Sequence, residues 1–142
     1  MTIRVLLVDD EEEFVEALAQ RLEIREFDVT TATSGAEALD RIAEKEIDLV
    51  ILDVQMPEVD GLEVLQKIKQ TKPLIEVIML TGHATVQTAI DGMKLGAFDF
   101  LMKPTETEDL VEKINRAFRR KEEHDSRIRE AEINEIVKRR GW

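Results

Sequence analysis

The chain has 142 residues, of which 43% are hydrophobic, and a formal net charge of -11 at pH 7. This length predicts one domain with a full core, and the acidic balance argues against direct nucleic-acid binding. No apolar stretch approaches the roughly 20 residues of a membrane span, and residues 1–4 lack the layout of a secretory signal. The absence of cysteine excludes disulfides and is typical of a reducing compartment, so the expected location is cytoplasmic.

Apolar runs of strand length alternate with amphipathic helical patterns along the chain. Strands are predicted near residues 3–8, 28–33, 48–53, 75–81 and 98–102. The runs at 5–8, 49–52 and 77–80 are continuously apolar and rich in β-branched residues. Such runs are typical of parallel strands that helices cover on both faces.

The segments between the strands carry the spacing of helices. Helices are predicted near residues 12–24, 35–45, 61–71 and 85–95, with a fifth beginning after Thr105. Ser34 followed by Glu37 is a capping-box pattern, and Gly96 stands where a helix prefers a left-handed exit. Strand and helix alternating five times predict a doubly wound α/β fold with a five-stranded parallel sheet.

The fifth helix is expected to extend beyond the domain. Residues 106–140 contain neither proline nor glycine, and a continuous helix of that length would reach roughly 50 Å. Residues 119–127 are entirely polar, so no packing is expected for them, whereas Ile128, Ile133 and Ile136 restore some apolar surface. The predicted division is a domain over 1–120 and a charged helical extension or linker over 121–142. Three alternatives are open for the extension: it continues the fifth helix, it forms a separate short helix, or it becomes ordered as a helix when it binds a partner.

Polar side chains follow the predicted strands at the point where each ends. Asp9 and Asp10 follow the first strand, Asp53 ends the third, Thr81 ends the fourth and Lys103 follows the fifth. Carboxyl ends of parallel strands meet at one edge of a sheet, where ligands of doubly wound folds bind. We therefore expect these five residues to share one site.

Three carboxylates at one sheet edge repel each other and require a cation. Carboxylate oxygens with open water positions suit Mg²⁺. Asp10 and Asp53 are expected to be direct ligands, Asp9 to hold a ligand water, and the backbone carbonyl of Gln55 to be a further candidate ligand. If Asp9 and Asp10 were the only acidic residues here, we would interpret them as a strand end that caps the next helix. The third carboxylate, Asp53 at the end of a neighbouring central strand, favours a metal site instead.

Asp53 is also a candidate nucleophile. A carboxylate that attacks phosphorus forms an acyl phosphate, and the transferred group needs cations and donors around its oxygens. Lys103 and the metal would supply the positive charge, and Thr81 would supply a hydroxyl donor. A cis peptide bond between Lys103 and Pro104 would direct the lysine inward.

In this order and spacing, the motifs resemble the receiver domain of bacterial two-component response regulators. The motifs are Asp9-Asp10-Glu11, Asp53-Val54-Gln55-Met56-Pro57, Asp60-Gly61, Thr81-Gly82, Gly96-Ala97-Phe98-Asp99-Phe100 and Lys103-Pro104. The resemblance implies a flavodoxin-like fold with strand order 2-1-3-4-5. It implies a Mg²⁺-dependent transfer of a phosphoryl group to Asp53 from a sensor histidine kinase. It assigns Mg²⁺ to Asp9, Asp10, Asp53 and the Gln55 carbonyl, and the phosphoryl ion pair to Lys103.

The resemblance also implies a switch. Thr81 would shift toward the phosphoryl group and Phe100, at a position where tyrosine is frequent, would change rotamer. The surface of the fourth helix, fifth strand and fifth helix would then alter, and in this family it commonly binds partners or another copy. A homodimer is expected through that surface or through the C-terminal helix. His83, beside Gly82, is interpreted as a rim side chain.

The favoured function is a signalling phosphoacceptor with self-catalysed phosphorylation and dephosphorylation, which is not an enzyme with turnover. The runner-up is a Mg²⁺-dependent phosphatase of small molecules with an aspartyl nucleophile. Haloacid-type enzymes place a second aspartate two residues after the nucleophile, where this chain has Gln55, and they carry a cap insertion. A vestigial interaction module is the third hypothesis, and the complete set of site residues argues against it. The chain is interpreted either as a stand-alone receiver or as the front part of a longer regulator.

Overall fold

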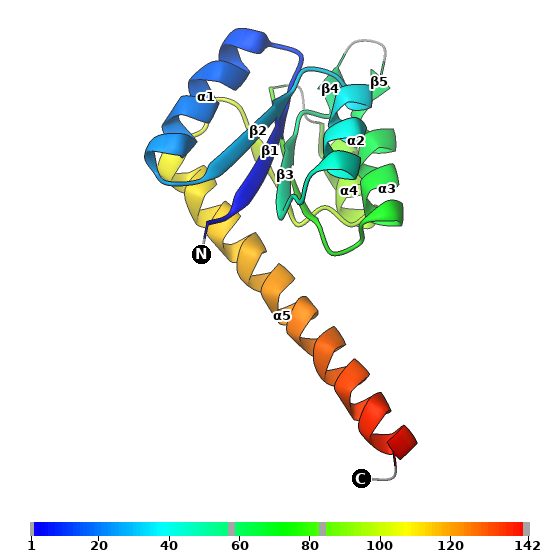
Figure 1. The fold of residues 1–142 in the computed structure, drawn as a ribbon. Coiled ribbons are helices and arrows are strands. Elements are labelled where there is room, and N and C mark those ends of the chain that lie inside the picture. The colour runs from blue at the N-terminus through cyan, green and yellow to red at the C-terminus, as the bar shows by residue number, and fades with distance from the viewer. Residues whose placement is uncertain (1, 57–58, 83–84, 141–142) are drawn as a thin grey trace.

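The computed structural model describes residues 2–56, 59–82 and 85–140 (Figure 1). Its main sheet has five parallel strands in the order β2-β1-β3-β6-β7. This is the expected order 2-1-3-4-5, since a short separate hairpin supplies β4 and β5. The strands of the main sheet are β1 (Arg4–Val8), β2 (Asp28–Ala32), β3 (Leu49–Leu52), β6 (Glu76–Thr81) and β7 (Asp99–Met102).

Helices cover both faces of the sheet, as Figure 1 shows. One face is covered by α1 (Glu12–Ile24) and the first part of α5 (Thr107–Arg140), and the other by α2 (Gly35–Glu44), α3 (Gly61–Thr71) and α4 (Val86–Lys94). The doubly wound α/β fold is confirmed.

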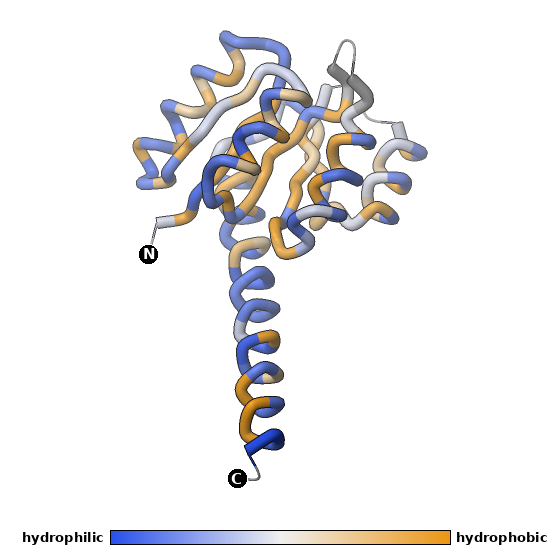
Figure 2. The backbone as a smooth tube through the Cα atoms, turned by 45° about the vertical axis from the view of Figure 1, so that its right-hand side comes forward, coloured by the Kyte–Doolittle hydropathy of each residue, from blue (hydrophilic) through white to orange (hydrophobic). Residues whose placement is uncertain are grey.

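Two cores lie on the two faces of the sheet. Val5 and Leu7 pack with α1 and α5, whereas Leu6 and Val8 pack with α2 and α3. This division follows from the alternation of side chains along a strand. The central strands are buried on both faces, which explains their continuously apolar runs and their orange colour in Figure 2.

Several local signals act as predicted. Ser34 caps α2, because its Oγ accepts a hydrogen bond of 3.1 Å from the backbone N–H of Glu37. Gly96 follows α4 with φ +108°, a conformation that favours glycine. Gly61 has another reason to be glycine: a Cβ there would lie 2.3 Å from the Cα of Val54, so only glycine lets α3 begin this close to the residue after Asp53.

The segment after Asp53 has secondary structure of its own. It contains an antiparallel hairpin of β4 (Gln55–Met56) and β5 (Val59–Asp60). A backbone hydrogen bond of 3.2 Å from Gly61 to Val54 brings the two ends of the segment together. Pro57, the last residue of the motif that begins at Asp53, lies outside the described residues.

The fifth helix is a single α-helix as far as Arg140, and its last part projects from the domain as an arm (Figure 1). Figure 2 shows this arm hydrophilic near the domain and partly hydrophobic toward its end. The expectation that residues 119–127 do not pack is wrong for Arg120 and Lys121, which form ion pairs with buried Glu76 and Asp48. Within the described ranges, no helix is both long enough and apolar enough to cross a membrane.

Candidate functional site

The carboxyl ends of the central strands bring the predicted site residues to one edge of the sheet. Asp53 follows β3, and its backbone N–H donates a hydrogen bond of 2.9 Å to the carbonyl of Val8, the residue before Asp9. On the other side, the backbone N–H of Lys103 donates to the carbonyl of Thr81 at 3.0 Å. The strand ladders thus continue into the site and fix these backbones relative to one another.

Asp9, Asp10 and Asp53 form an acidic cluster. Each offers a carboxylate oxygen, and these oxygens all lie within 4.8 Å of one another. Asp9 is 4% exposed and Asp53 5% exposed, while Asp10 is exposed to solvent. Three hard oxygen donors this close, one of them open to water, suit a small divalent cation that keeps part of its hydration shell.

Lys103 lies beside this cluster. Its Nζ donates a hydrogen bond of 2.5 Å to Asp9 Oδ2 and lies 3.8 Å from Asp53 Oδ2 and 3.7 Å from Glu11 Oε1. Burial would lower the pKa of the Lys103 ammonium, but the hydrogen bond to Asp9 and the nearby carboxylates outweigh burial and raise the pKa. The lysine is therefore a fixed positive charge next to Asp53.

The surroundings of Asp9 disfavour the ionised form of its carboxyl group. A small pocket between α1 and the sheet is walled by Asp9 and Asp53 together with apolar side chains such as Leu18 and Ile51. This burial raises the pKa of the Asp9 carboxyl, although Lys103 and the backbone N–H of Glu11 donate hydrogen bonds to it. A bound cation would offset that cost.

Phe14 contributes to the site although its sequence position predicts only a core residue. The Lys103 Nζ lies 4.1 Å from the centroid of the Phe14 ring, a cation–π contact. Phe14 falls on the apolar stripe of α1, and helical spacing cannot distinguish such a contact from ordinary packing. Glu11 was also missed as a partner of Lys103, because its place after Asp10 predicts only the start of a helix.

The remaining predicted residues occupy the surroundings of the cluster. Thr81 is the last residue of β6 and is fully buried. Phe100 lies on β7 opposite Met79 and packs against the core on the side of α2 and α3. The peptide bond between Lys103 and Pro104 is cis, as expected. Gln55 has its backbone in β4, and His83 lies outside the described residues.

The sequence matches the family described as "Response regulator receiver domain" over residues 5–115. A "Putative response regulator NtrX-like" of Rickettsia bellii is 41% identical over 117 residues, which are 81% of this chain and 24% of the relative. "Response regulator MprA" of Mycobacterium bovis is 36% identical over 126 residues, 89% of this chain and 55% of the relative. The chain thus spans about a quarter of the NtrX-like protein and about half of MprA.

Solved structures agree with these sequence matches. A CheY-like response regulator receiver domain protein from Methanospirillum hungatei has a TM-score of 0.84 at 30% identity and covers 87% of this chain and 99% of its own. A receiver domain from Clostridium thermocellum has a TM-score of 0.80 at 40% identity, covering 84% and 97%. NtrX from Brucella abortus, with a TM-score of 0.79 at 30% identity, covers 100% of this chain and 30% of its own.

Proposed function

This chain belongs to the response regulator receiver domain family of two-component systems, and from that premise we propose that Asp53 accepts a phosphoryl group from a sensor histidine kinase. One observation carries the proposal: Asp53 lies in a cluster of three carboxylates whose oxygens fall within 4.8 Å, with the Lys103 Nζ 3.8 Å from its Oδ2. Nothing in core packing requires a lysine and three acids to meet at one strand edge.

Mg²⁺ is the cation that this donor set suits best. Asp9, Asp10 and Asp53 would hold it together with the backbone carbonyl of Gln55, all of them hard oxygen donors. When bound, Mg²⁺ supplies positive charge that offsets the carboxylates and the phosphoryl oxygens. The raised pKa of Asp9 supports this assignment, because it marks a carboxylate that is buried without full compensation.

The chemistry of the transfer is assigned to groups of the chain itself. A carboxylate oxygen of Asp53 forms a bond to phosphorus while the P–N bond of the kinase phosphohistidine breaks, and the imidazole leaves with the bonding electron pair. Lys103 would then pair with the phosphoryl oxygens, because its ammonium already lies beside Asp53. Thr81, on the neighbouring strand end, would donate its hydroxyl to the same oxygens.

The signal would pass from this site to the surface of α4, β7 and α5. On phosphorylation, a phosphoryl group with roughly two negative charges and new acceptor oxygens replaces the single charge of the Asp53 carboxylate, which would draw Thr81 inward and let Phe100 change rotamer. Val86, Ile90 and Met93 are exposed on α4 at the i, i+4 and i+7 spacing of one helix face. This α4 stripe is an apolar surface suited to a partner protein or a second copy of the chain.

An ion pair lies beside the α4 stripe, and the arm provides a separate apolar surface. An ion pair of 2.6 Å between Lys113 and Asp99 joins α5 to β7 beside it. The arm offers a second route to a homodimer, because Ile128, Ile133 and Ile136 are exposed on it.

Incubation with acetyl phosphate and Mg²⁺ followed by intact-mass measurement tests the proposal. Wild type should gain one phosphoryl group per chain, and Asp53→Asn or chelation of the metal should abolish the gain. A phosphatase would instead release many molecules of inorganic phosphate per chain. Mass gain that persists in Asp53→Asn would place the phosphoacceptor elsewhere and refute the assignment.

A further inference from the structure

Two buried carboxylates lie at the opposite edge of the sheet from the acidic cluster. Asp48 directly precedes β3 and is 3% exposed, and Glu76 begins β6 and is 1% exposed. These are the two strands that carry Asp53 and Thr81 at their other ends. A buried carboxylate is unfavourable unless a cation compensates it, so the partners of these two residues indicate their role.

Asp48 has two cationic partners. The backbone N–H and Nε of Arg4 donate to Asp48 Oδ2 at 2.9 and 3.0 Å, and Arg4 Nη2 donates to Oδ1 at 3.0 Å. The second partner comes from α5: Lys121 Nζ lies 3.4 Å from Asp48 Oδ1 and 3.1 Å from Asp125 Oδ2. Burial by itself would raise the pKa of Asp48, but the hydrogen bonds from Arg4 outweigh burial and lower the pKa.

The charge of Glu76 is compensated mainly by α5, more directly than that of Asp48. Arg120 Nε lies 2.8 Å from Glu76 Oε2, and Lys69 Nζ lies 3.6 Å from Oε1. Among the described residues, Glu76 Oε2 accepts no well-directed hydrogen bond, so the ion pair with Arg120 is its compensation. The Arg120 guanidinium also lies 5.2 Å from the centroid of the Phe98 ring, a second contact with the domain.

We propose that Asp48 and Glu76 form a clamp that holds the root of the arm, residues 119–125, against the amino edge of the sheet. Consecutive helical residues point about 100° apart, so Arg120 and Lys121 anchor the helix on two sides. The clamp fixes the rotation of α5 about its axis as well as its tilt. The arm therefore leaves the domain in one direction, as a rigid continuation of the packed part of α5.

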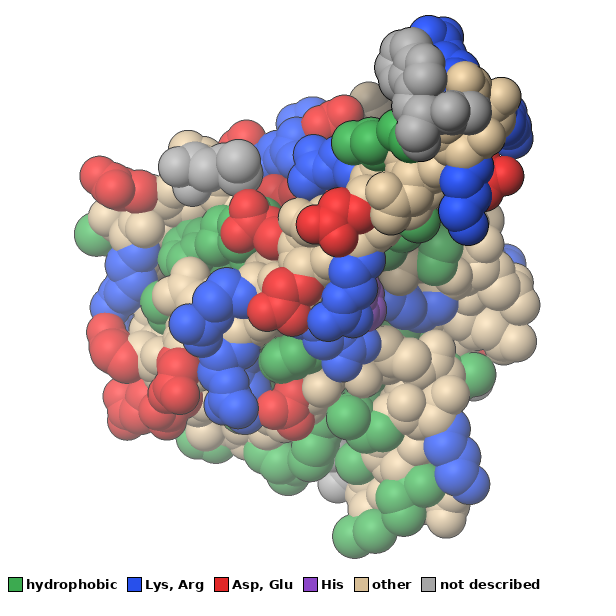
Figure 3. Space-filling view, turned by 90° about the horizontal axis from the view of Figure 1, so that it is seen from below, with side chains coloured by type: hydrophobic (Ala, Val, Ile, Leu, Met, Phe, Trp, Pro, Cys, Tyr) green, Lys and Arg blue, Asp and Glu red, His purple; other side chains and the backbone are tan. Residues whose placement is uncertain are grey.

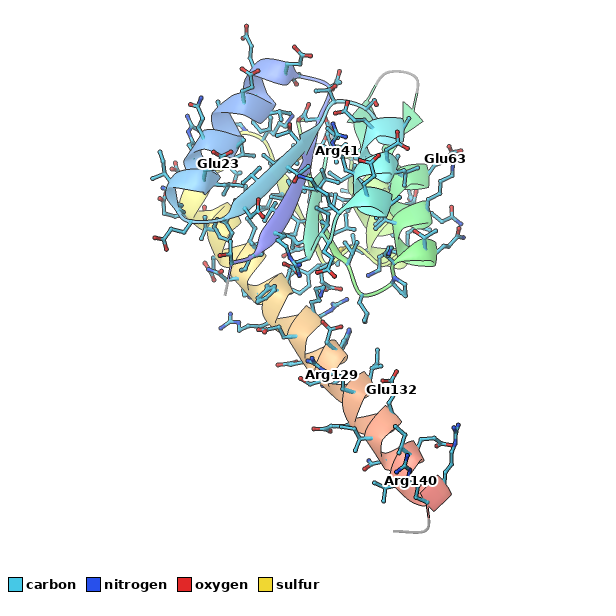
Figure 4. All side chains as sticks on the ribbon, in the orientation of Figure 1. Glu23, Arg41, Glu63, Arg129, Glu132 and Arg140 are labelled. Atoms are coloured by element: carbon cyan, nitrogen blue, oxygen red, sulfur yellow. The ribbon has the colours of Figure 1, made fainter. Side chains whose placement is uncertain are left out.

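The alternative is that the cations merely neutralise two acids. Apolar residues would fill such positions at equal or lower cost in stability, and buried ion pairs are best attested as devices that specify position. Past the clamp the structure offers nothing comparable: the described residues 126–136 are exposed, and Figure 4 shows Arg129, Glu132 and Arg140 on the projecting arm. Figure 3 views the side from which the arm projects, where basic and acidic side chains are interspersed.

The clamp can be tested on the full chain by distance measurement. Because the chain has no cysteine, Glu63→Cys and Glu132→Cys can be spin-labelled selectively, one on α3 and one on the arm. Wild type should give a narrow distance distribution between the labels by electron paramagnetic resonance. Adding Arg120→Met and Lys121→Met should broaden it at least twofold, whereas Arg129→Met with Lys138→Met, which removes the same charge from the arm, should not.

Hydrogen exchange provides a second, label-free measurement. In the Arg120→Met, Lys121→Met chain, the amides of residues 119–127 should exchange at least about tenfold faster than in wild type. In the Arg129→Met, Lys138→Met chain, their exchange rates should equal those of wild type. Glu76→Gln should also speed the exchange of these amides. If the Glu76→Gln chain does not fold, the two double variants of the arm are sufficient to test the clamp. An unchanged distribution and unchanged exchange in the Arg120 and Lys121 variant would overturn the clamp. Neither measurement needs a phosphodonor, so the result is independent of the proposed phosphorylation of Asp53.

Discussion

Lys103 is bound to Asp9, at 2.5 Å between Nζ and Oδ2, rather than to Asp53, which lies 3.8 Å from the same nitrogen. The lysine thus compensates the aspartate beside the proposed phosphoacceptor and leaves the Asp53 oxygens less tightly paired with it. Phosphorylation would place new negative charge within reach of an ammonium that is already ionised. The exchange of Asp9 for the phosphoryl group as lysine partner is the first electrostatic step we expect of the switch.

Lys103→Met tests the role of that charge while keeping the aliphatic stem. Loss of a positioned cation next to a transferring group typically slows reaction by about 10²–10³-fold, and we expect that loss in the rate of phosphorylation by acetyl phosphate. The rate is measured by intact mass over time. Lys67→Met, which removes an exposed lysine of α3, is the control and should react at the wild-type rate. A Lys103→Met chain within twofold of wild type would remove the lysine from the reaction.

Mg²⁺ should stabilise the folded chain through the acidic cluster. A ligand at 100 times its dissociation constant stabilises the native state by about 2.7 kcal/mol. Thermal unfolding with and without saturating Mg²⁺ should show this shift in wild type and a much smaller one in Asp10→Asn, which removes the exposed carboxylate of the cluster. Glu23→Gln, an exposed carboxylate on α1 (Figure 4), should retain the full shift. Equal shifts in all three chains would mean that Mg²⁺ binds elsewhere.

Phe14→Leu keeps an apolar side chain on α1 and removes the ring that faces Lys103. A cation–π contact of about 0.5–1 kcal/mol corresponds to a change of roughly two- to fivefold. We expect the phosphorylation rate to fall by that factor, because the ammonium is held less firmly beside Asp53. Phe27→Leu, at a phenylalanine that packs against the same core, controls for lost packing. If both variants slow the reaction equally, the ring acts through the core alone.

Acid should weaken the contact of Asp48 with Arg4 and Lys121. The folded-state pKa of Asp48 is below its ordinary value of 3.8. Asp48 therefore contributes stability that is present above that value and is lost as the pH falls through the folded pKa. Asp48→Asn should cost about 1.5–3 kcal/mol at pH 7, the range for a lost hydrogen bond to a charged group, and progressively less below pH 3.8.

Urea unfolding across that pH range measures the difference between Asp48→Asn and wild type. Asp40→Asn, at an exposed carboxylate of α2, should differ little from wild type at every pH. A penalty for Asp48→Asn that does not change with pH would mean that the residue acts through packing rather than charge.

The doubly wound fold class and the gathering of the candidate site residues were predictable because both leave local marks on the sequence. Continuous apolar runs mark strands, and Asp53 and Lys103 directly follow two of them: β3, which is fully buried, and the edge strand β7, which is only partly buried. The parallel arrangement then brings residues far apart in the chain to one edge. The strand order itself came from the family resemblance, since apolar runs do not specify which strands are neighbours.

The contacts that were not predicted join residues without a shared periodicity. Arg120 and Glu76 are 44 positions apart, and a polar run such as 119–127 looks solvated whether or not a buried carboxylate lies opposite. Helical spacing places Phe14 on the inner face of α1 but does not indicate that Lys103 covers its ring. Ion pairs and cation–π contacts are set by tertiary geometry, so they leave no local sign in the sequence.

The exposed α4 stripe of Val86, Ile90 and Met93 makes a prediction about assembly. With beryllofluoride and Mg²⁺ as a phosphoryl mimic, wild type should dimerise in light-scattering measurements. Ile90→Asp should weaken the dimer at least tenfold, because an apolar side chain contributes about 1.5–3 kcal/mol when buried and a buried aspartate adds a penalty. Ile24→Asp, at an exposed isoleucine of α1, should leave the dimer intact.

The same measurement separates the two homodimer routes. A dimer that survives Ile90→Asp and is lost in Ile136→Asp would assign the contact to the arm instead of α4. Wild type that remains monomeric under activation would refute both homodimer routes, and the α4 stripe would then be assigned to a different protein. Phosphorylation of Asp53 should proceed in every one of these variants, because none of the substituted residues contacts the acidic cluster or Lys103.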